Sequence, residues 1–202
     1  MWRRTVLIGM TLVAAATFAA AQGDNRPLSP AGSSATQLGK DGKWIEITYS
    51  RPIKRGRDLW GSGPTYAKEV LLQDGAKVWR AGANVSTRLK TEVPLLIGGK
   101  RVPAGEYSLF IDTKSPSDWT LIVSSWPAQP KYDPNSDNKT ALYGSFGYTP
   151  DKDVARVAMK MDKFSLSVDQ MTWNFADVTP AGGKLVLMWD TVVASAPFTV
   201  SK

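Results

Sequence analysis

The sequence of 202 residues contains no cysteine and no histidine. Without cysteine the chain can form neither disulfides nor thiolate metal sites, and it has no cysteine nucleophile. Without histidine it cannot hold a Ser-His-Asp triad, a His-ligated zinc ion or a histidine general base. Any catalysis must therefore rest on carboxylates, lysine, tyrosine or a Ser-Lys pair. No motif indicates a cofactor, and we predict none.

The N-terminus has the pattern of a secretory signal peptide. Arg3 and Arg4 form a positive n-region, Val6 to Ala16 form an apolar h-region, and Phe18-Ala19-Ala20-Ala21 supplies small residues for cleavage. The apolar run is short for a membrane span. We therefore predict that residues 1–21 are removed, that the mature protein has no transmembrane segment, and that it is periplasmic or secreted.

The charge favours anionic partners only weakly. The chain has 25 Lys and Arg against 18 Asp and Glu, a net charge of +7, and two of the positive charges lie in the predicted signal peptide. The one local basic cluster, Lys54, Arg55 and Arg57, is typical of a solvated loop. Because there is no basic stripe and export is expected, we predict no nucleic-acid partner.

The fold class follows from the spacing of the apolar residues. Residues 22–41 are rich in Ser, Pro, Gly and Ala, which predicts a flexible lead-in. From residue 42 onward, runs such as Trp44 to Tyr49 alternate with period two, and Gly98-Gly99 predicts a tight hairpin. Roughly ten short strands and no convincing long helix indicate an all-β protein. We predict that residues 42–202 form one mostly antiparallel two-layer sandwich, of which a jelly roll is one form.

Three motifs together resemble a known family. They are Tyr49-Ser50-Arg51-Pro52, Trp79-Arg80-Ala81-Gly82-Ala83-Asn84 and Pro103-Ala104-Gly105-Glu106-Tyr107-Ser108-Leu109-Phe110. The family consists of exported bacterial proteins and is catalogued as domain of unknown function 2911. The resemblance runs from about Ser29 to Phe198 and implies an exported β-rich domain with no assigned activity.

The chain departs from the family pattern directly after the central motif. Val85 and Ser86 stand where the family usually has an acidic residue followed by alanine. If that acidic residue has a chemical role in the family, this chain has lost it.

The central motif carries the best polar constellation. Arg80, Asn84 and Thr87 lie close together in sequence. Arginine offers a planar fork for carboxylate or phosphate, and asparagine offers both a donor and an acceptor. One hypothesis is that the three line a pocket for an anionic or polyhydroxylated ligand. The alternative is structural: Arg80 pairs with a carboxylate, and Asn84 caps a turn beside Gly82.

Tryptophan is the other candidate for ligand contact. Large aromatic side chains in strands usually fill the core. This is expected for the five tryptophans in or beside predicted strands, which are Trp44, Trp79, Trp119, Trp173 and Trp189. Trp60 and Trp126 lie in predicted loops instead. They are the better candidates for exposed aromatic platforms of the kind that sugar-binding modules use.

Neither a metal site nor a catalytic residue is assigned. The run from Asp133 to Asn138 begins with the oxygen spacing of a calcium loop but lacks the required glycine and the bidentate glutamate, so we predict no metal. Carboxylates occur in or beside several predicted strands, but their spatial pairing is not fixed by their positions in sequence.

We interpret the protein as a non-enzymatic binding module for a saccharide, an anionic polymer or a protein of the envelope or exterior. Its candidate ligand-binding residues are Arg80, Asn84, Thr87, Trp60 and Trp126. One alternative is a carboxylate-based enzyme that acts on glycans without histidine or cysteine. The other is a structural or assembly protein.

Overall fold

The chain folds into two antiparallel β-sheets that face each other. The computed structural model describes residues 27–40, 42–71, 78–135 and 139–201. The predicted signal peptide lies outside these residues. The elements in chain order are β1 (Ala31–Gln37), β2 (Trp44–Ser50), η1 (Gly63–Thr65), α1 (Lys68–Leu71), β3 (Thr87–Thr91), β4 (Leu95–Ile97), β5 (Lys100–Val102), β6 (Gly105–Ser115), β7 (Asp118–Ser124), η2 (Pro150–Lys152), β8 (Asp153–Ala158), β9 (Lys160–Thr179) and β10 (Gly182–Val200).

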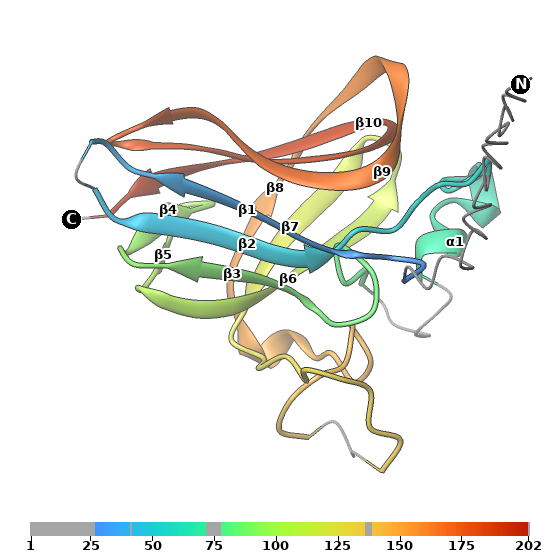
Figure 1. The fold of residues 1–202 in the computed structure, drawn as a ribbon, viewed down its shortest axis with the longest axis horizontal. Coiled ribbons are helices and arrows are strands. Elements are labelled where there is room, and N and C mark those ends of the chain that lie inside the picture. Colours follow the sequence, from blue (N-terminus) through green and yellow to red (C-terminus); the bar gives the residue numbers. More distant parts are fainter. Residues whose placement is uncertain (1–26, 41, 72–77, 136–138, 202) are drawn as a thin grey trace, which may run out of the picture.

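The strand order confirms the predicted all-β, antiparallel sandwich. One sheet has six strands in the order β1-β2-β3-β6-β7-β8, and the other has four in the order β5-β4-β10-β9. Figure 1 shows the two layers, with the long β9–β10 hairpin across the top. Most neighbouring strands are also consecutive in the chain. This order differs from the interleaved Greek keys of a jelly roll.

The β9–β10 hairpin is bent by irregular pairing near its middle. The register shifts on both sides of Asp190, and this residue has a φ of 54°. Such bulges increase the local twist of a strand pair. The hairpin therefore curves around the sandwich (Figure 1), and its strongly bent part brings Asp169 and Asp190 toward the loop that follows β2.

The predicted flexible lead-in is wrong for residues 31–37. These residues form β1, which pairs with β2 along its whole length, from Ala31 opposite Ser50 to Gln37 opposite Trp44. The apolar pattern of β1 is weak because it carries Gly32, Ser33 and Ser34. Backbone pairing with β2 organises this segment, and such pairing does not depend on an apolar face of its own.

The core lies between the sheets and is rich in tryptophan. Ile45, Ile47 and Tyr49 of β2 point into it, as their period-two spacing predicts. Four indoles meet there, with the rings of Trp60 and Trp119 centred 4.9 Å apart and those of Trp79 and Trp189 stacked at 5.9 Å. Offset or edge-on aromatic pairs of this kind add stability beyond the area that they bury.

Trp44 is the exception among the tryptophans assigned to strands. The predicted burial is correct for Trp79, Trp119, Trp173 and Trp189, but Trp44 is 49% exposed. It is out of phase with the buried residues Ile45, Ile47 and Tyr49, so its side chain lies on the outer face of the six-stranded sheet. No helix in the described parts of the chain is long and apolar enough to cross a membrane.

We predict that Trp173→Phe lowers the free energy of unfolding by about 1–3 kcal/mol, because it removes a buried hydrogen bond and some core volume. Trp173 is fully buried, and its indole Nε1 donates to the carbonyl of Ala81 at 2.9 Å. Urea denaturation followed by circular dichroism measures the change. The matched control is Trp44→Phe at the exposed position, with an expected change within about 0.5 kcal/mol. Equal effects of the two substitutions would contradict this account of the core.

Candidate functional site

The central motif forms a loop that is tied to its own backbone. The guanidinium Nη1 of Arg80 donates to the carbonyl of Asn84 at 2.8 Å. The hydroxyl of Thr87 donates to the carbonyl of Ala81 at 2.9 Å. Arg80 and Thr87 are both buried, and Ala81 and Asn84 have positive φ values of 54° and 56°. These side chains hold a backbone path that non-glycine residues seldom adopt.

Two buried indoles reinforce the same loop. Trp79 Nε1 donates to the carbonyl of Gly82 at 3.1 Å, and Trp173 Nε1 donates to the carbonyl of Ala81. A Cβ at position 82 would lie 2.7 Å from the Thr87 hydroxyl, so only glycine fits there without a shift. The motif thus has a clear structural role in joining the two sheets.

Arg80, Asn84 and Thr87 do lie together, as their spacing predicts, but their side chains donate to three different backbone carbonyls. Arg80 and Thr87 are directed at loop carbonyls, whereas the exposed Asn84 donates from Nδ2 to the carbonyl of Ser29 at 3.4 Å. In this contact the Arg80 guanidinium binds a backbone carbonyl of its own loop. A ligand role for the three residues remains a prediction.

The prediction that Trp60 and Trp126 are exposed platforms is wrong. Trp60 is 9% exposed and packs among the indoles of the main core. Trp126 is 7% exposed, and its Nε1 donates to the carbonyl of Thr149 at 3.1 Å. The prediction rested on the position of both residues in loops. Residues distant in sequence cover both rings.

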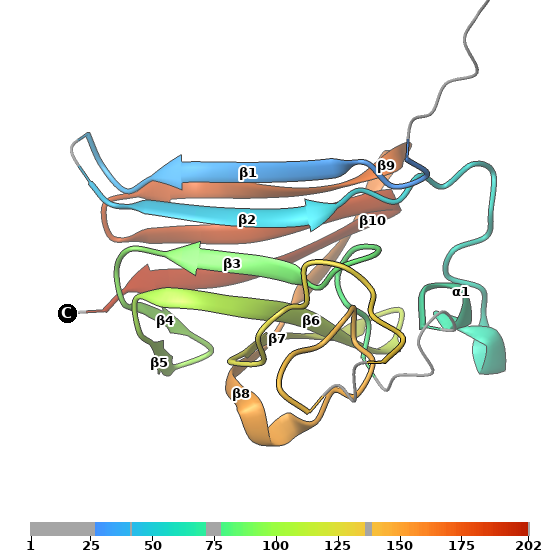
Figure 2. The same ribbon diagram turned by 60° about the horizontal axis from the view of Figure 1, so that its bottom comes forward.

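Described residues of the segment between β7 and η2 cover part of the outer face of the six-stranded sheet, over β6 and β7. Phe110 of β6 and Ile122 of β7 point outward, yet both are fully buried. They form a second, smaller hydrophobic cluster with Val78, Trp126 and Leu142, against which Tyr148 packs. Figure 2 shows this segment in front of β6, with β1, β2 and β3 uncovered beside it.

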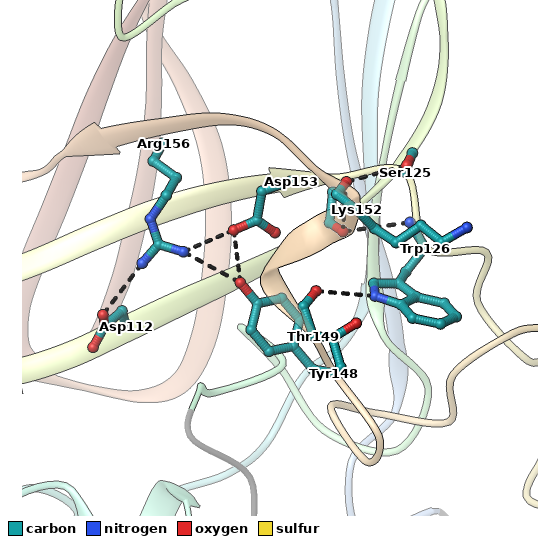
Figure 3. Close-up of polar contacts among 9 residues, drawn as sticks. Asp112, Ser125, Trp126, Tyr148, Thr149, Lys152, Asp153 and Arg156 are labelled. Carbon is teal, nitrogen blue, oxygen red and sulfur yellow. Dashed lines mark hydrogen bonds and ion pairs between the residues drawn. The ribbon is translucent and has the colours of Figure 1, made fainter. Parts of the chain in front are cut away.

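A polar network fixes the end of this covering segment (Figure 3). The Tyr148 hydroxyl donates to Asp153 Oδ2 at 2.7 Å, and Arg156 Nη1 donates to the same oxygen at 2.7 Å. The other arm of the Arg156 guanidinium reaches Asp112 at 3.3 Å. Lys152 adds a cation–π contact, with its Nζ 5.1 Å from the ring centre of Trp126. The network joins the covering segment to β6 and β8.

The pKa of Tyr148 is raised above the usual tyrosine value of 10.0, mainly by burial and then by its bond to Asp153. The ionised phenolate would lie beside a carboxylate in a poorly solvated place. Tyr148 therefore remains a neutral hydrogen-bond donor across the physiological pH range, which suits its structural role in holding the covering segment.

Another part of the outer face carries two adjoining hollows. The larger, of about 480 Å³, lies over β1, β2 and the start of β3. The smaller, of about 260 Å³, lies toward the other end of β2. Glu46 borders both, so they adjoin, and we call the two together the outer groove. Its lining residues are Ala31, Gly32, Ser33, Ala35, Trp44, Glu46, Thr48, Tyr49, Ser50, Val85, Ser86, Arg88, Lys90 and Glu92.

The outer groove combines an exposed indole with charged groups. Glu46 lies directly opposite Lys90 in the sheet. The carboxylate of Glu92 accepts a hydrogen bond from the backbone N–H of Trp44 at 2.9 Å, which fixes it beside the indole. Arg88 forms an ion pair with Glu106 at the groove's border. The Ser86 hydroxyl donates to the carbonyl of Gly144, which joins the groove wall to the covering segment.

The sequence signal for this groove is the phase of β2. Because Ile45, Ile47 and Tyr49 define the buried face, Trp44, Glu46 and Thr48 must share the opposite face. In the sequence-based prediction, the usual burial of tryptophan is given more weight than this alternation, and Trp44 is therefore placed in the core. Arg88 and Lys90 in β3 follow the same rule.

A family model described as protein of unknown function (DUF2911) matches residues 29–198. The chain belongs to this family. The match confirms the resemblance seen in the sequence and includes β1, which the sequence analysis had assigned to a lead-in. Comparisons with curated proteins and with solved structures find no match.

In this DUF2911 protein, the Trp79–Asn84 motif is chiefly a fold-determining loop. In the described parts of the chain, no group of three or more carboxylates is placed to hold a metal ion. Of the calcium-like run, Asp133 to Asn135 are described, and Asp133 caps the backbone N–H of Asn135 at 2.9 Å. Such a bond is typical of a polar turn.

We predict that Tyr148→Phe changes the alkaline pH dependence of stability. A raised folded-state pKa favours the folded state below the unfolded value of 10.0, and this contribution is lost as the pH rises toward the folded-state pKa. The parent protein should therefore lose stability above about pH 10, and the variant should lose less. Urea denaturation at a series of pH values tests this. Identical pH profiles would show that Tyr148 does not bind its proton more tightly in the folded state.

Proposed function

We propose that this protein is an exported, non-enzymatic binding module that holds a saccharide chain in the outer groove. The observation that carries the proposal is the 49% exposed Trp44, whose indole lies in a groove beside the charged side chains of Glu46, Lys90 and Glu92. Export is supported by the signal-peptide pattern of residues 1–21.

The chemistry of the groove suits a sugar. An indole offers a flat apolar surface for the C–H face of a sugar ring. The carboxylates of Glu46 and Glu92 accept hydrogen bonds from hydroxyl groups, and the Lys90 ammonium donates them. An apolar platform with a few fixed polar groups is the usual composition of a small-molecule site.

The shape of the groove favours an oligosaccharide over a single sugar. Trp44 and Thr48 point outward four residues apart on β2, which places them roughly 13 Å apart along the strand. The two hollows follow the same line and share Glu46. The face is open to solvent, so a polymer chain can bind along the groove from the side and its end does not have to enter first.

Glycan hydrolysis is a second candidate function. Glu46 and Glu92 both line the smaller hollow, and paired carboxylates are the usual catalysts of glycoside cleavage. Three features favour binding instead. The Glu92 carboxylate is engaged by the Trp44 backbone, Glu46 lies opposite Lys90, and the described groove has no lid that would exclude water.

We predict that Trp44→Ala weakens saccharide binding by at least about tenfold, since it removes the stacking platform. A glycan array with residues 22–202 identifies the oligosaccharide, and isothermal titration calorimetry then measures its affinity. The matched control is Phe146→Ala, which removes a 56% exposed aromatic side chain that does not line the groove and should leave the affinity unchanged. If no glycan binds, or if both variants bind like the parent, the saccharide proposal is wrong.

Glu46→Gln separates binding from hydrolysis. For a binding module, the oligosaccharide stays intact during prolonged incubation with the parent protein, as mass spectrometry would show. Cleavage by the parent that disappears in Glu46→Gln would favour the enzyme. The amide preserves the size of the side chain, so a loss of cleavage without a loss of binding would assign chemistry to the carboxylate.

A further inference from the structure

The basic cluster after Pro52 is divided by the fold. Lys54 Nζ lies 2.6 Å from Asp190 Oδ1, and Arg57 Nη1 lies 2.7 Å from Glu69 Oε1, so both are neutralised. The exposed Arg55 guanidinium donates only to the carbonyl of Leu28, at 3.4 Å. In the part of the chain that the structure describes, it contacts no carboxylate. Arg55 is therefore the one member of this cluster that is exposed and has no ion pair among the described residues.

Arg51 is a second arginine without a carboxylate partner among the described residues. Its Nε reaches the carbonyl of Met171 at 3.5 Å, and its Nη2 reaches the hydroxyl of Thr172 at 3.4 Å. These are long bonds to neutral oxygens, which leave the charge of the guanidinium uncompensated. Arg51 belongs to the Tyr49–Pro52 motif, whose role the outer groove does not explain.

The fold makes room for the Arg51 side chain. A Cβ at Gly32 of β1 would lie 2.4 Å from Cδ and 2.7 Å from Cγ of Arg51, so the arginine stem lies directly against the glycine backbone. The other arginine, Arg55, has a φ of 52°. Its backbone N–H donates to Asp169 Oδ1 at 3.2 Å, which holds the backbone in this conformation. Contacts with the rest of the fold thus position both arginines.

Arg51 and Arg55 line one hollow of about 690 Å³. Its size is within the range of small-molecule sites. Gln170 contributes an amide, and the remaining side chains are apolar. They are Pro27, Leu28, Pro30, Ala31 and Ile53. Leu28 is 72% exposed, so the apolar wall is open to a ligand.

We propose that this hollow binds a small organic anion, with its phosphate or carboxylate group on Arg51 and Arg55 and its apolar part against Leu28 and Ile53. Guanidinium forks match both head groups, and two of them compensate a dianion better than one. The apolar wall distinguishes this site from one for free inorganic phosphate, which would gain nothing from it. The phosphate could belong to a soluble metabolite or to a lipid.

The site adjoins the outer groove at Ala31, but it does not share the groove's charged residues or Trp44. Its charged residues follow β2 in the chain, whereas Trp44, Glu46 and Lys90 lie along the outer face of the sheet. The proposal therefore does not depend on saccharide binding, and Trp44→Ala serves as a control that should leave anion binding unchanged.

The test is calorimetric titration of residues 22–202 at low ionic strength with four probes: hexyl phosphate, hexanoate, inorganic phosphate and hexanol. We expect hexyl phosphate to bind at least about tenfold more tightly than inorganic phosphate or hexanol, because only it uses both parts of the site. Hexanoate shows whether a carboxylate suffices. Co-sedimentation with phosphatidylcholine vesicles, with and without phosphatidic acid, tests the lipid source.

Arg55→Gln and Arg51→Gln should each weaken binding of the bound probe by about tenfold or more. Arg101→Gln is the matched control, because it removes one charge at an exposed site on β5 away from the hollow. Since Arg55 is exposed, its substitution should leave the melting temperature unchanged even if Arg51→Gln destabilises the fold. Absence of saturable binding by any probe, or equal weakening by Arg55→Gln and Arg101→Gln, would overturn the proposal.

Discussion

The buried indole N–H groups are the constraint on which the rest of the structure depends. A tryptophan between two sheets supplies a large apolar ring, but its N–H needs an acceptor within the protein. Four of the five indoles in the main core find one in a loop, in β9 or on a neighbouring side chain, whereas the buried Nε1 of Trp60 has none among the described residues. The pairs are Trp79 with the Gly82 carbonyl, Trp119 with the Tyr66 hydroxyl, Trp173 with the Ala81 carbonyl and Trp189 with the Asp169 carbonyl. Core packing therefore also fixes the loops.

This constraint explains the Trp79–Asn84 motif. The Trp79–Asn84 loop receives hydrogen bonds from two indoles, from the Arg80 guanidinium and from the Thr87 hydroxyl. Each bond goes to a backbone carbonyl, and together they stabilise two positive-φ residues that are not glycine. A motif of polar and small residues can thus be required by the fold itself. Its presence alone is not evidence of a ligand site.

Two parts of the outer face of the six-stranded sheet have different roles. On β6 and β7, outward apolar residues such as Phe110 and Ile122 are covered by the segment that follows β7, and the Tyr148–Asp153–Arg156 network holds that cover in place. On β1, β2 and β3 the outward residues include charged side chains, the exposed Trp44 and small residues such as Ala35, and the described covering segment lies beside them. A rigid scaffold with one uncovered face is well suited to binding.

The sequence by itself determined the strand class, the period-two core of β2, the Gly98–Gly99 hairpin and the chemistries excluded by the absence of histidine and cysteine. These follow from local propensity and from residue types. Only the tertiary structure decided that β1 joins the sheet, that Trp60 and Trp126 are buried, and that Arg51 and Arg55 share a hollow. The physical reason is the same in each case. Backbone pairing, burial and charge compensation depend on partners far away in sequence, such as Trp119 for Trp60 and Asp190 for Lys54.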